Sequence, residues 1–275
     1  MVLLYVINLV ELNHHLPFAI EDENARWICV GAYNMFFILM LLLTEKYTTK
    51  EGTDLRDAFA FWGVLAVFVY LVLFHNSVIE ARDSYFFGST PIGFNLHYAL
   101  VALLIFVCAI SIRKVKKLKE FNIRTSNAYS WFYVAFFVFL ASTELDNIVL
   151  LISGASDNIY EVLDQNHKIG WPILWGVTSF VLIFVGLQMK LRHLRIISLT
   201  LFLITLIKLF AVDIQGISEG GKIAAFISLG VLLLVVSFMY QRLKKLLMKD
   251  EEDAKPVVVP ESNESNESGE IKPNI

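Results

Sequence analysis

The stretch FLASTELDNIVLL, residues Phe139–Leu151, decides the fold, because it places two carboxylates inside an apolar run long enough to cross a bilayer. The apolar run itself extends from Tyr129 to Ile152. A charge at the centre of a membrane helix costs about 2.5–3.5 kcal/mol on insertion scales, and such residues usually face the interior of a bundle. We therefore interpret Glu144 and Asp146 as polar residues of a helical membrane protein.

The composition of the whole chain supports this interpretation. Of its 275 residues, 56% are hydrophobic and 18% are charged, and the mean hydropathy is +0.61. Soluble domains average roughly 45–50% apolar and 25% charged residues, so several membrane spans are indicated. The only cysteines, Cys29 and Cys108, fall in different apolar runs, which argues against a disulfide and against a thiolate metal site. The N-terminal sequence has no basic region and no cleavage site, so it predicts a first helix rather than a signal peptide.

Apolar runs of about 20 residues predict an all-α, polytopic transmembrane bundle of about eight helices. The predicted helices are Val2–Leu16, Trp27–Leu43, Asp57–Phe74, Phe94–Ile112, Tyr129–Ile152, Trp171–Met189, Arg195–Val212 and Ile223–Leu243. Lys and Arg gather after the second, fourth, sixth and eighth helices, whereas each alternate loop holds one basic residue. Short basic loops are typically cytoplasmic, so both termini are expected in the cytoplasm. Residues 249–275 are rich in Pro, Ser, Asn and Glu, and we expect a disordered acidic cytoplasmic tail.

The two halves of the membrane region resemble each other. INLVELNHHL aligns with LASTELDNIV, which places Glu11 on Glu144, and two later helices match in the same order. We therefore predict two four-helix repeats, residues 1–120 and 121–248. Because four is an even number, the repeats would share one orientation about an axis along the membrane normal.

The candidate polar interior centres on Glu144. Asn147 lies three residues further along the same helix face, whereas Asp146 points elsewhere. We expect Glu144 to be buried and Asp146 to lie nearer the outer interface. Lys208, about 7 Å before Asp213 along its helix at 1.5 Å per residue, is the predicted partner of Glu144. The pair could form an ion or proton pathway, could hold two helices together, or Lys208 could reach to the interface on its own.

Other candidate chemistry is sparse. Glu11 and His14 have the E-x-x-H spacing of carboxylate-bridged metal bundles. A complete site needs a second such pair, but the second repeat offers Glu144 with Asn147. The alternative is that Glu11 and His14 are polar residues that face the outer water. His97 is interpreted as a helix-capping residue near the outer interface. Three tryptophans, namely Trp27, Trp171 and Trp175, are interpreted as interfacial anchors. The sequence contains no catalytic motif and no nucleic-acid signature, which favours a protein that is not an enzyme, with no cofactor and no metal.

Three segments, KIGWPILWG, IKLFAVDIQGIS and FISLGVLLLVVSFMYQRLKKL, resemble the bacterial multi-pass membrane family known as domain of unknown function 2339. The residues that carry the resemblance are Trp171, Lys208, Phe210, Asp213, Gly216, Ser228, Gly230, Ser237, Tyr240 and Gln241. The resemblance is specific over the last 80 or so residues before the tail and implies a helical protein of the bacterial inner membrane. Family members look longer, so this chain would correspond to their C-terminal part or to a short relative. The resemblance brings no catalytic residues with it.

Two functions are consistent with the sequence. Repeat architecture with intramembrane charge suggests transporter-like handling of a small or lipid-linked substrate, with Glu11, Glu144 and Lys208 as the polar interior. The absence of a recognisable site and the short first helix suggest instead a non-catalytic subunit or scaffold that packs against another membrane protein. In either case the lipid bilayer is the expected surrounding.

Overall fold

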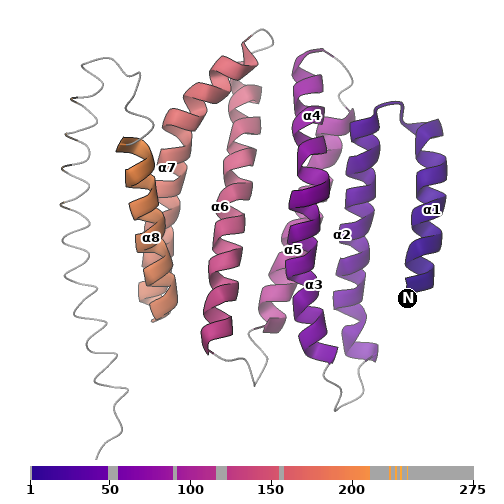
Figure 1. The fold of residues 1–275 in the computed structure, drawn as a ribbon, viewed down its shortest axis with the longest axis horizontal. Coiled ribbons are helices and arrows are strands. Elements are labelled where there is room, and N and C mark those ends of the chain that lie inside the picture. The colour runs from indigo at the N-terminus through magenta and orange to yellow at the C-terminus, as the bar shows by residue number, and fades with distance from the viewer. Residues whose placement is uncertain are drawn as a thin grey trace, which may run out of the picture. The chain divides into compact units, whose positions relative to one another are not determined.

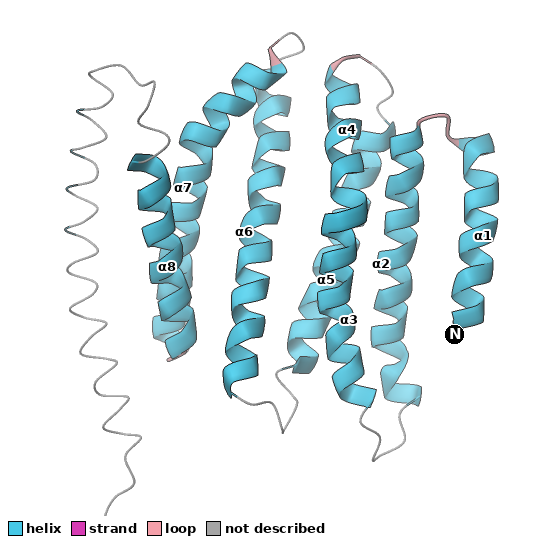
Figure 2. Cartoon of the chain, in the orientation of Figure 1, coloured by secondary structure: helices cyan, strands magenta, loops and turns pink. Residues whose placement is uncertain are grey.

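A computed structural model of the chain describes residues 2–48, 55–88, 92–115, 123–154 and 158–210, and four isolated positions between 223 and 234. Within these residues the protein is all-α, as predicted, and no strand occurs (Figure 2). Asp213 and the tail 249–275 lie outside the described residues, as does the predicted helix Ile223–Leu243 apart from the isolated positions.

The described helices are α1 (Val2–Ala19), α2 (Glu23–Thr48), α3 (Leu55–Val69), the π-helix η1 (Tyr70–Phe74), α4 (His75–Phe86), α5 (Ile92–Val115), α6 (Ile123–Ser153), α7 (Ile159–Gln188) and α8 (Arg192–Lys208). Because α3, η1 and α4 follow one another without a break, they form one continuous helix, and the described residues form seven helical rods. All seven belong to one unit, Met1–Ile217, and run alternately up and down within it (Figure 1).

Five of the described helices are long and apolar enough to cross a membrane. These candidate spans are Glu23–Thr44, Phe61–Phe86, Ile92–Lys114, Asn127–Ser153 and Ile159–Gln188. The prediction of about eight spans is therefore supported for five. Two others, α1 and α8, are not among the candidate spans, and the eighth lies mostly outside the described residues.

The core is built from helix stripes at the spacing that the helical period requires. On α2, Ile28, Met35 and Leu42 repeat every seven residues and are all nearly inaccessible. On α5, Leu100 and Leu104 are fully buried against the same core. Large apolar side chains also cover the outside of these helices, as expected where the surrounding solvent is lipid rather than water.

The prediction of an outer loop is wrong for two segments, because long parts of both are helical. The sequence HNSVIEARDSYF continues the third span as α4, in which Val78 and Ala81 are buried. Likewise α7 begins at Ile159, twelve residues before the predicted start at Trp171. A criterion based on hydropathy ends a predicted helix where polar residues become frequent. The helix itself can continue beyond the apolar layer as long as one of its faces still buries side chains.

The π-helix η1 interrupts the third span at its middle. The N–H of His75 donates to the carbonyl of Tyr70, five residues earlier, in place of the usual four. Tyr70 and Phe74 are both buried, so this widened turn contributes two aromatic rings to the core. Segments of this kind frequently occur at functional sites.

Side-chain contacts join α6 to the preceding helices. The hydroxyl of Tyr133 donates to Oγ of Ser111 on α5 at 3.0 Å, and the ring centroids of Tyr70 and Phe136 are 6.3 Å apart. Gly63 of α3 permits this approach, because a Cβ there would lie 2.1 Å from the Ser111 Oγ. The polar residues of α6 are thereby held against α5.

Candidate functional site

A buried polar cluster lies where α5 meets α6. His97 of α5 is completely inaccessible, and its Nδ1 contacts the carbonyl oxygen of Phe94. Its Nε2 lies 3.6 Å from Oε2 of Glu144 and 3.4 Å from Nδ2 of Asn147, both on α6. The same Asn147 Nδ2 donates to Glu144 Oε2 at 3.3 Å. One amide group therefore bridges an imidazole and a carboxylate from two helices.

Aromatic residues surround this cluster. The rings of Phe94 and Tyr98 lie 4.8 and 3.9 Å from the His97 ring, centroid to centroid. Tyr98 and the buried Tyr70 of η1 also interact electrostatically with Glu144. Aromatic side chains of α5 and η1 therefore lie close to the cluster and form part of its surroundings.

A second polar cluster lies where α6 meets α7. Asp146 accepts hydrogen bonds from Asn166 Nδ2 at 2.7 Å and from the Trp171 indole N–H at 3.0 Å, both on Oδ1. Its Oδ2 lies 3.0 Å from Nε2 of His167. The three partners span the first part of α7, so the carboxylate fixes the position of that helix segment. The side chain of His167 stays 42% exposed, and its ring lies tilted against that of Trp171, with ring centroids 4.3 Å apart.

Lys208 lies next to this second cluster. Its Nζ donates to the backbone carbonyl of His167 at 2.7 Å. Pro172 follows five residues later inside α7, where it has no N–H to donate and therefore weakens the helix ladder. Figure 2 shows α7 changing direction along its length, as expected of a helix with an internal proline. The end of α8 is thus tied to the bent part of α7.

An apolar groove begins directly beside Trp171. Its volume is about 250 Å³, and it lies between α6, α7 and α8. The lining residues are Trp131, Val134, Ala135, Val138, Phe139, Ser142, Trp171, Trp175, Ile197, Leu201 and Ile204. The Ser142 hydroxyl is engaged by the Trp175 indole N–H at 2.8 Å, which leaves an almost wholly apolar wall. Trp171 belongs to both the groove and the Asp146 cluster.

The predicted pairing of Glu144 with Lys208 is wrong for the described residues. Glu144 faces His97 and Asn147, whereas Lys208 lies at the carbonyl of His167. The predicted burial is also reversed, because the Asp146 side chain is 7% exposed and that of Glu144 is 22% exposed. The sequence cannot reveal which helix covers which face of α6, and the contact with α7 buries Asp146. The predicted sharing of one face by Glu144 and Asn147 is confirmed.

Glu11 and His14 do not come together. Glu11 pairs with His15 one turn later, at 2.9 Å, and both side chains are exposed. His14 packs edge-on against His15 and Phe18. Across the described residues, no group of three or more His, Cys, Asp or Glu side chains could hold a metal ion. Cys29 and Cys108 are both free thiols.

Three functional candidates escaped the sequence interpretation. The sequence predicts a helix cap at His97, which is buried, and a loop at Asn166 and His167, which belong to α7. A signal was present, because His167 and Trp171 stand four residues apart, which is the spacing of one helix face. A criterion based on hydropathy alone does not detect this spacing, since the polar residues precede the apolar run.

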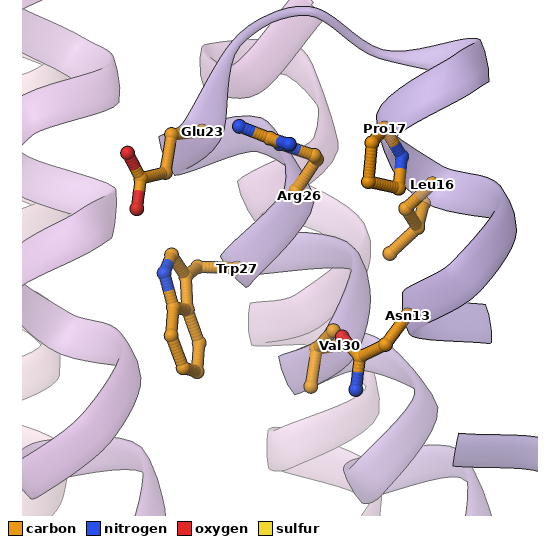
Figure 3. Close-up of a pocket in the computed structure, with 7 residues that line it drawn as sticks. All are labelled: Asn13, Leu16, Pro17, Glu23, Arg26, Trp27 and Val30. Carbon is orange, nitrogen blue, oxygen red and sulfur yellow. The ribbon is translucent and has the colours of Figure 1, made fainter. Parts of the chain in front are cut away.

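A separate pocket of about 240 Å³ lies between α1 and α2. Asn13, Leu16 and Pro17 of α1 face Arg26, Trp27 and Val30 of α2 across it, with Glu23 at its edge (Figure 3). Trp27 is 47% exposed. None of the described residues that line it belongs to the Glu144 cluster or to the Asp146 cluster.

The sequence was compared with known proteins. A family model described as "Predicted membrane protein (DUF2339)" matches residues 1–243, which is most of the chain. No curated protein and no solved structure matches it.

Proposed function

Since the chain belongs to the DUF2339 family of predicted membrane proteins, we propose that it binds a small or lipid-linked substrate within the bilayer and handles it in a transporter-like way. The observation that carries the proposal is the position of Trp171, which lines an apolar groove and also hydrogen-bonds to Asp146. An amphiphile needs this combination, with apolar walls for its chain and polar groups for its head.

The dimensions of the groove favour the lipid-linked substrate over a small soluble one. Along α6 the lining runs from Trp131 to Ser142, about 16 Å at 1.5 Å per residue. A volume of about 250 Å³ is below the 300–1,000 Å³ of ordinary ligand pockets, so it suits a slender chain rather than a whole ligand. The head would then lie near His167 and Lys208, beside Trp171.

The proposed architecture has two four-helix repeats, 1–120 and 121–248, in the bacterial inner membrane with both termini in the cytoplasm. In transporters built from repeats, substrate and coupling-ion sites lie near the interface between the repeats. The His97–Glu144 cluster fits this pattern, because its two residues come from opposite sides of the proposed boundary. Of the predicted polar interior, Glu144 and Lys208 are kept, while Glu11 is replaced by Asp146, since Glu11 is exposed.

The test is to purify the protein from native membranes in mild detergent and to identify bound molecules by mass spectrometry. Ala135→Phe fills the groove, while Val177→Phe places the same aromatic side chain on α7 at a position that is 56% exposed and outside the lining. We expect a defined species on the wild-type protein, a decrease of about tenfold or more in Ala135→Phe, and no change in Val177→Phe. Bound lipid that merely mirrors the membrane composition, or that is equal in all three proteins, contradicts the proposal.

A non-catalytic membrane subunit is the second candidate, and the surface of α1 favours it. Among the described helices, α1 packs principally against α2, and Leu3, Ile7 and Val10 are each more than half exposed. A partner helix could cover this surface in place of lipid.

Photo-crosslinking separates the two candidates. A photoreactive amino acid is placed at Ile7 and, as the control, at Phe106 of α5, which is 61% exposed. A single defined protein product from Ile7 alone supports the subunit function. Lipid products alone from both positions leave α1 as a lipid-facing helix and exclude the subunit function at this surface.

A further inference from the structure

We infer that His97, Glu144 and Asn147 form a binding site for a single proton at the contact between α5 and α6. This inference goes beyond the proposed function and stands without it, because it depends on no groove residue. It rests on the three distances that join these side chains and on the complete burial of His97.

The backbone decides where the proton of neutral His97 lies. Nδ1 contacts the carbonyl oxygen of Phe94, and a carbonyl can only accept a hydrogen bond. Nδ1 therefore carries the hydrogen, and Nε2 presents its lone pair toward α6. Both Nε2 and the facing oxygen of Glu144 are then hydrogen-bond acceptors.

Asn147 resolves this conflict in the proton-free state. Its side-chain amide has two N–H groups, and its Nδ2 lies 3.4 Å from Nε2 and 3.3 Å from Oε2 of Glu144. One hydrogen can be directed at each acceptor. The arrangement in the structure is therefore the one expected for neutral His97 beside ionised Glu144, with a net charge of −1.

A proton can enter this arrangement without moving a helix. It binds the lone pair of Nε2, which then becomes a donor directed at the carboxylate 3.6 Å away. The site changes from −1 to 0, and the amide hydrogen that had pointed at Nε2 is released. Asn147 keeps its bond to Glu144 or turns to another acceptor, so protonation is coupled to the orientation of this amide.

The charged groups nearest the site belong to α4, to α6 and to Asp22, the residue just before α2, whose Oδ2 would lie 3.1 Å from a Cβ on Gly93, one turn before His97. Tyr70 of η1 and Tyr98 of α5 are the titratable groups that interact with Glu144, and both are neutral phenols near neutral pH; Tyr98 in turn interacts with Tyr85 of α4. On α4, Arg82 is paired with Asp83 at 2.8 Å.

On α6 itself, Asp146 is turned to α7 and bound by three donors there. No other charged side chain among the described residues is within ion-pairing distance of His97 or Glu144.

The experiment is nitrogen NMR of the six histidines in protein reconstituted in nanodiscs, with the His97 signal assigned by its loss in His97→Asn. Between about pH 4 and pH 9 we expect neutral His97 to carry its hydrogen on Nδ1 and to gain a second one on Nε2 as the pH falls. The Asn147 side-chain amide signal should change with the same midpoint. The opposite tautomer, or an amide that does not follow the histidine, would overturn the inference.

Glu144→Gln preserves the shape of the side chain and removes its charge. We expect the protonation equilibrium constant of His97 to fall by about tenfold, because the imidazolium loses its facing carboxylate. The control Glu161→Gln removes an exposed carboxylate from α7 and should leave the titration unchanged. Equal titration of His97 in the wild-type protein and in both variants would overturn the inference. Ala135→Phe, which tests the groove, should leave this titration unchanged, so failure of the inference can be told apart from failure of the proposed function.

Discussion

Nε2 of His167 lies 3.0 Å from Oδ2 of Asp146, so a carboxylate on α6 holds a partly exposed imidazole on α7. The other oxygen of Asp146 is occupied by Asn166 and Trp171, which leaves the carboxylate little freedom to turn. The ring of His167 is thereby oriented.

Asp146→Ala should destabilise the protein by about 2 kcal/mol or more, because the buried Asn166 and the partly exposed His167 and Trp171 all lose their acceptor. Unfolding in detergent, followed by heat or denaturant, measures the effect. The matched control is Asp164→Ala, which removes an exposed carboxylate paired only with Lys168 one turn away. That change should alter the unfolding free energy by less than about 0.5 kcal/mol, and equal effects of the two variants would contradict the role given to Asp146.

Gly63→Ala should loosen the contact of α3 with α5 and α6. The added Cβ would lie 2.1 Å from Oγ of Ser111 and 2.7 Å from the hydroxyl of Tyr133, so these groups must move. We expect a loss of about 1–3 kcal/mol. Gly176→Ala is the comparison, because nothing lies within 4 Å of a Cβ there, and alanine should be neutral or stabilising by up to about 1 kcal/mol.

The pair Trp175 and Ser142 should show a measurable coupling across α6 and α7. The indole N–H lies 2.8 Å from the hydroxyl oxygen, and the bond lies beside the apolar groove. A double-mutant cycle with Trp175→Phe and Ser142→Ala should give an interaction of about 0.6 kcal/mol, and at most about 1.7 kcal/mol. Additive effects of the two substitutions would show that the bond contributes nothing in the membrane.

The proposed orientation can be tested by cysteine labelling in intact cells, after Cys29 and Cys108 are replaced by alanine. Tyr160→Cys lies near the start of α7 and Met189→Cys just after its end, and both native side chains are well exposed. A membrane-impermeant thiol reagent should label Tyr160→Cys from outside, whereas Met189→Cys should react only after the membrane is opened. The reverse pattern would place the termini outside the cytoplasm.

The sequence predicted the class of fold, because hydropathy reports which residues can lie in lipid. It predicted that Glu144 and Asn147 share a helix face, because that depends only on the helical period. It did not predict that Asp146 is the more buried acid, because burial depends on which helix packs on each side of α6.

The length of the helices also escaped prediction for a physical reason. The residues before Trp171 are polar, yet Ile159, Leu163 and Asn166 recur at helical spacing and are buried in α7. Because a criterion that averages hydropathy over a window excludes this polar stretch, it does not assign Asn166 and His167 to a helix. Similarly, the burial of His97 follows from its contact with α6, which no local pattern specifies.

The π-helix Tyr70–Phe74 has a consequence for how the chain tolerates changes in length. A π turn holds one residue more than an α turn but completes about the same rotation, so deleting one residue between Tyr70 and Phe74 would restore an ordinary helix and leave its two ends facing their present directions. Elsewhere in this span a deletion would rotate the following part by about 100° relative to the preceding part, and Tyr70, which interacts with Glu144, and the buried stripe of α4 could then no longer face their present partners together. The widened turn is therefore the place in this span where the loss of one residue should disturb the packing least.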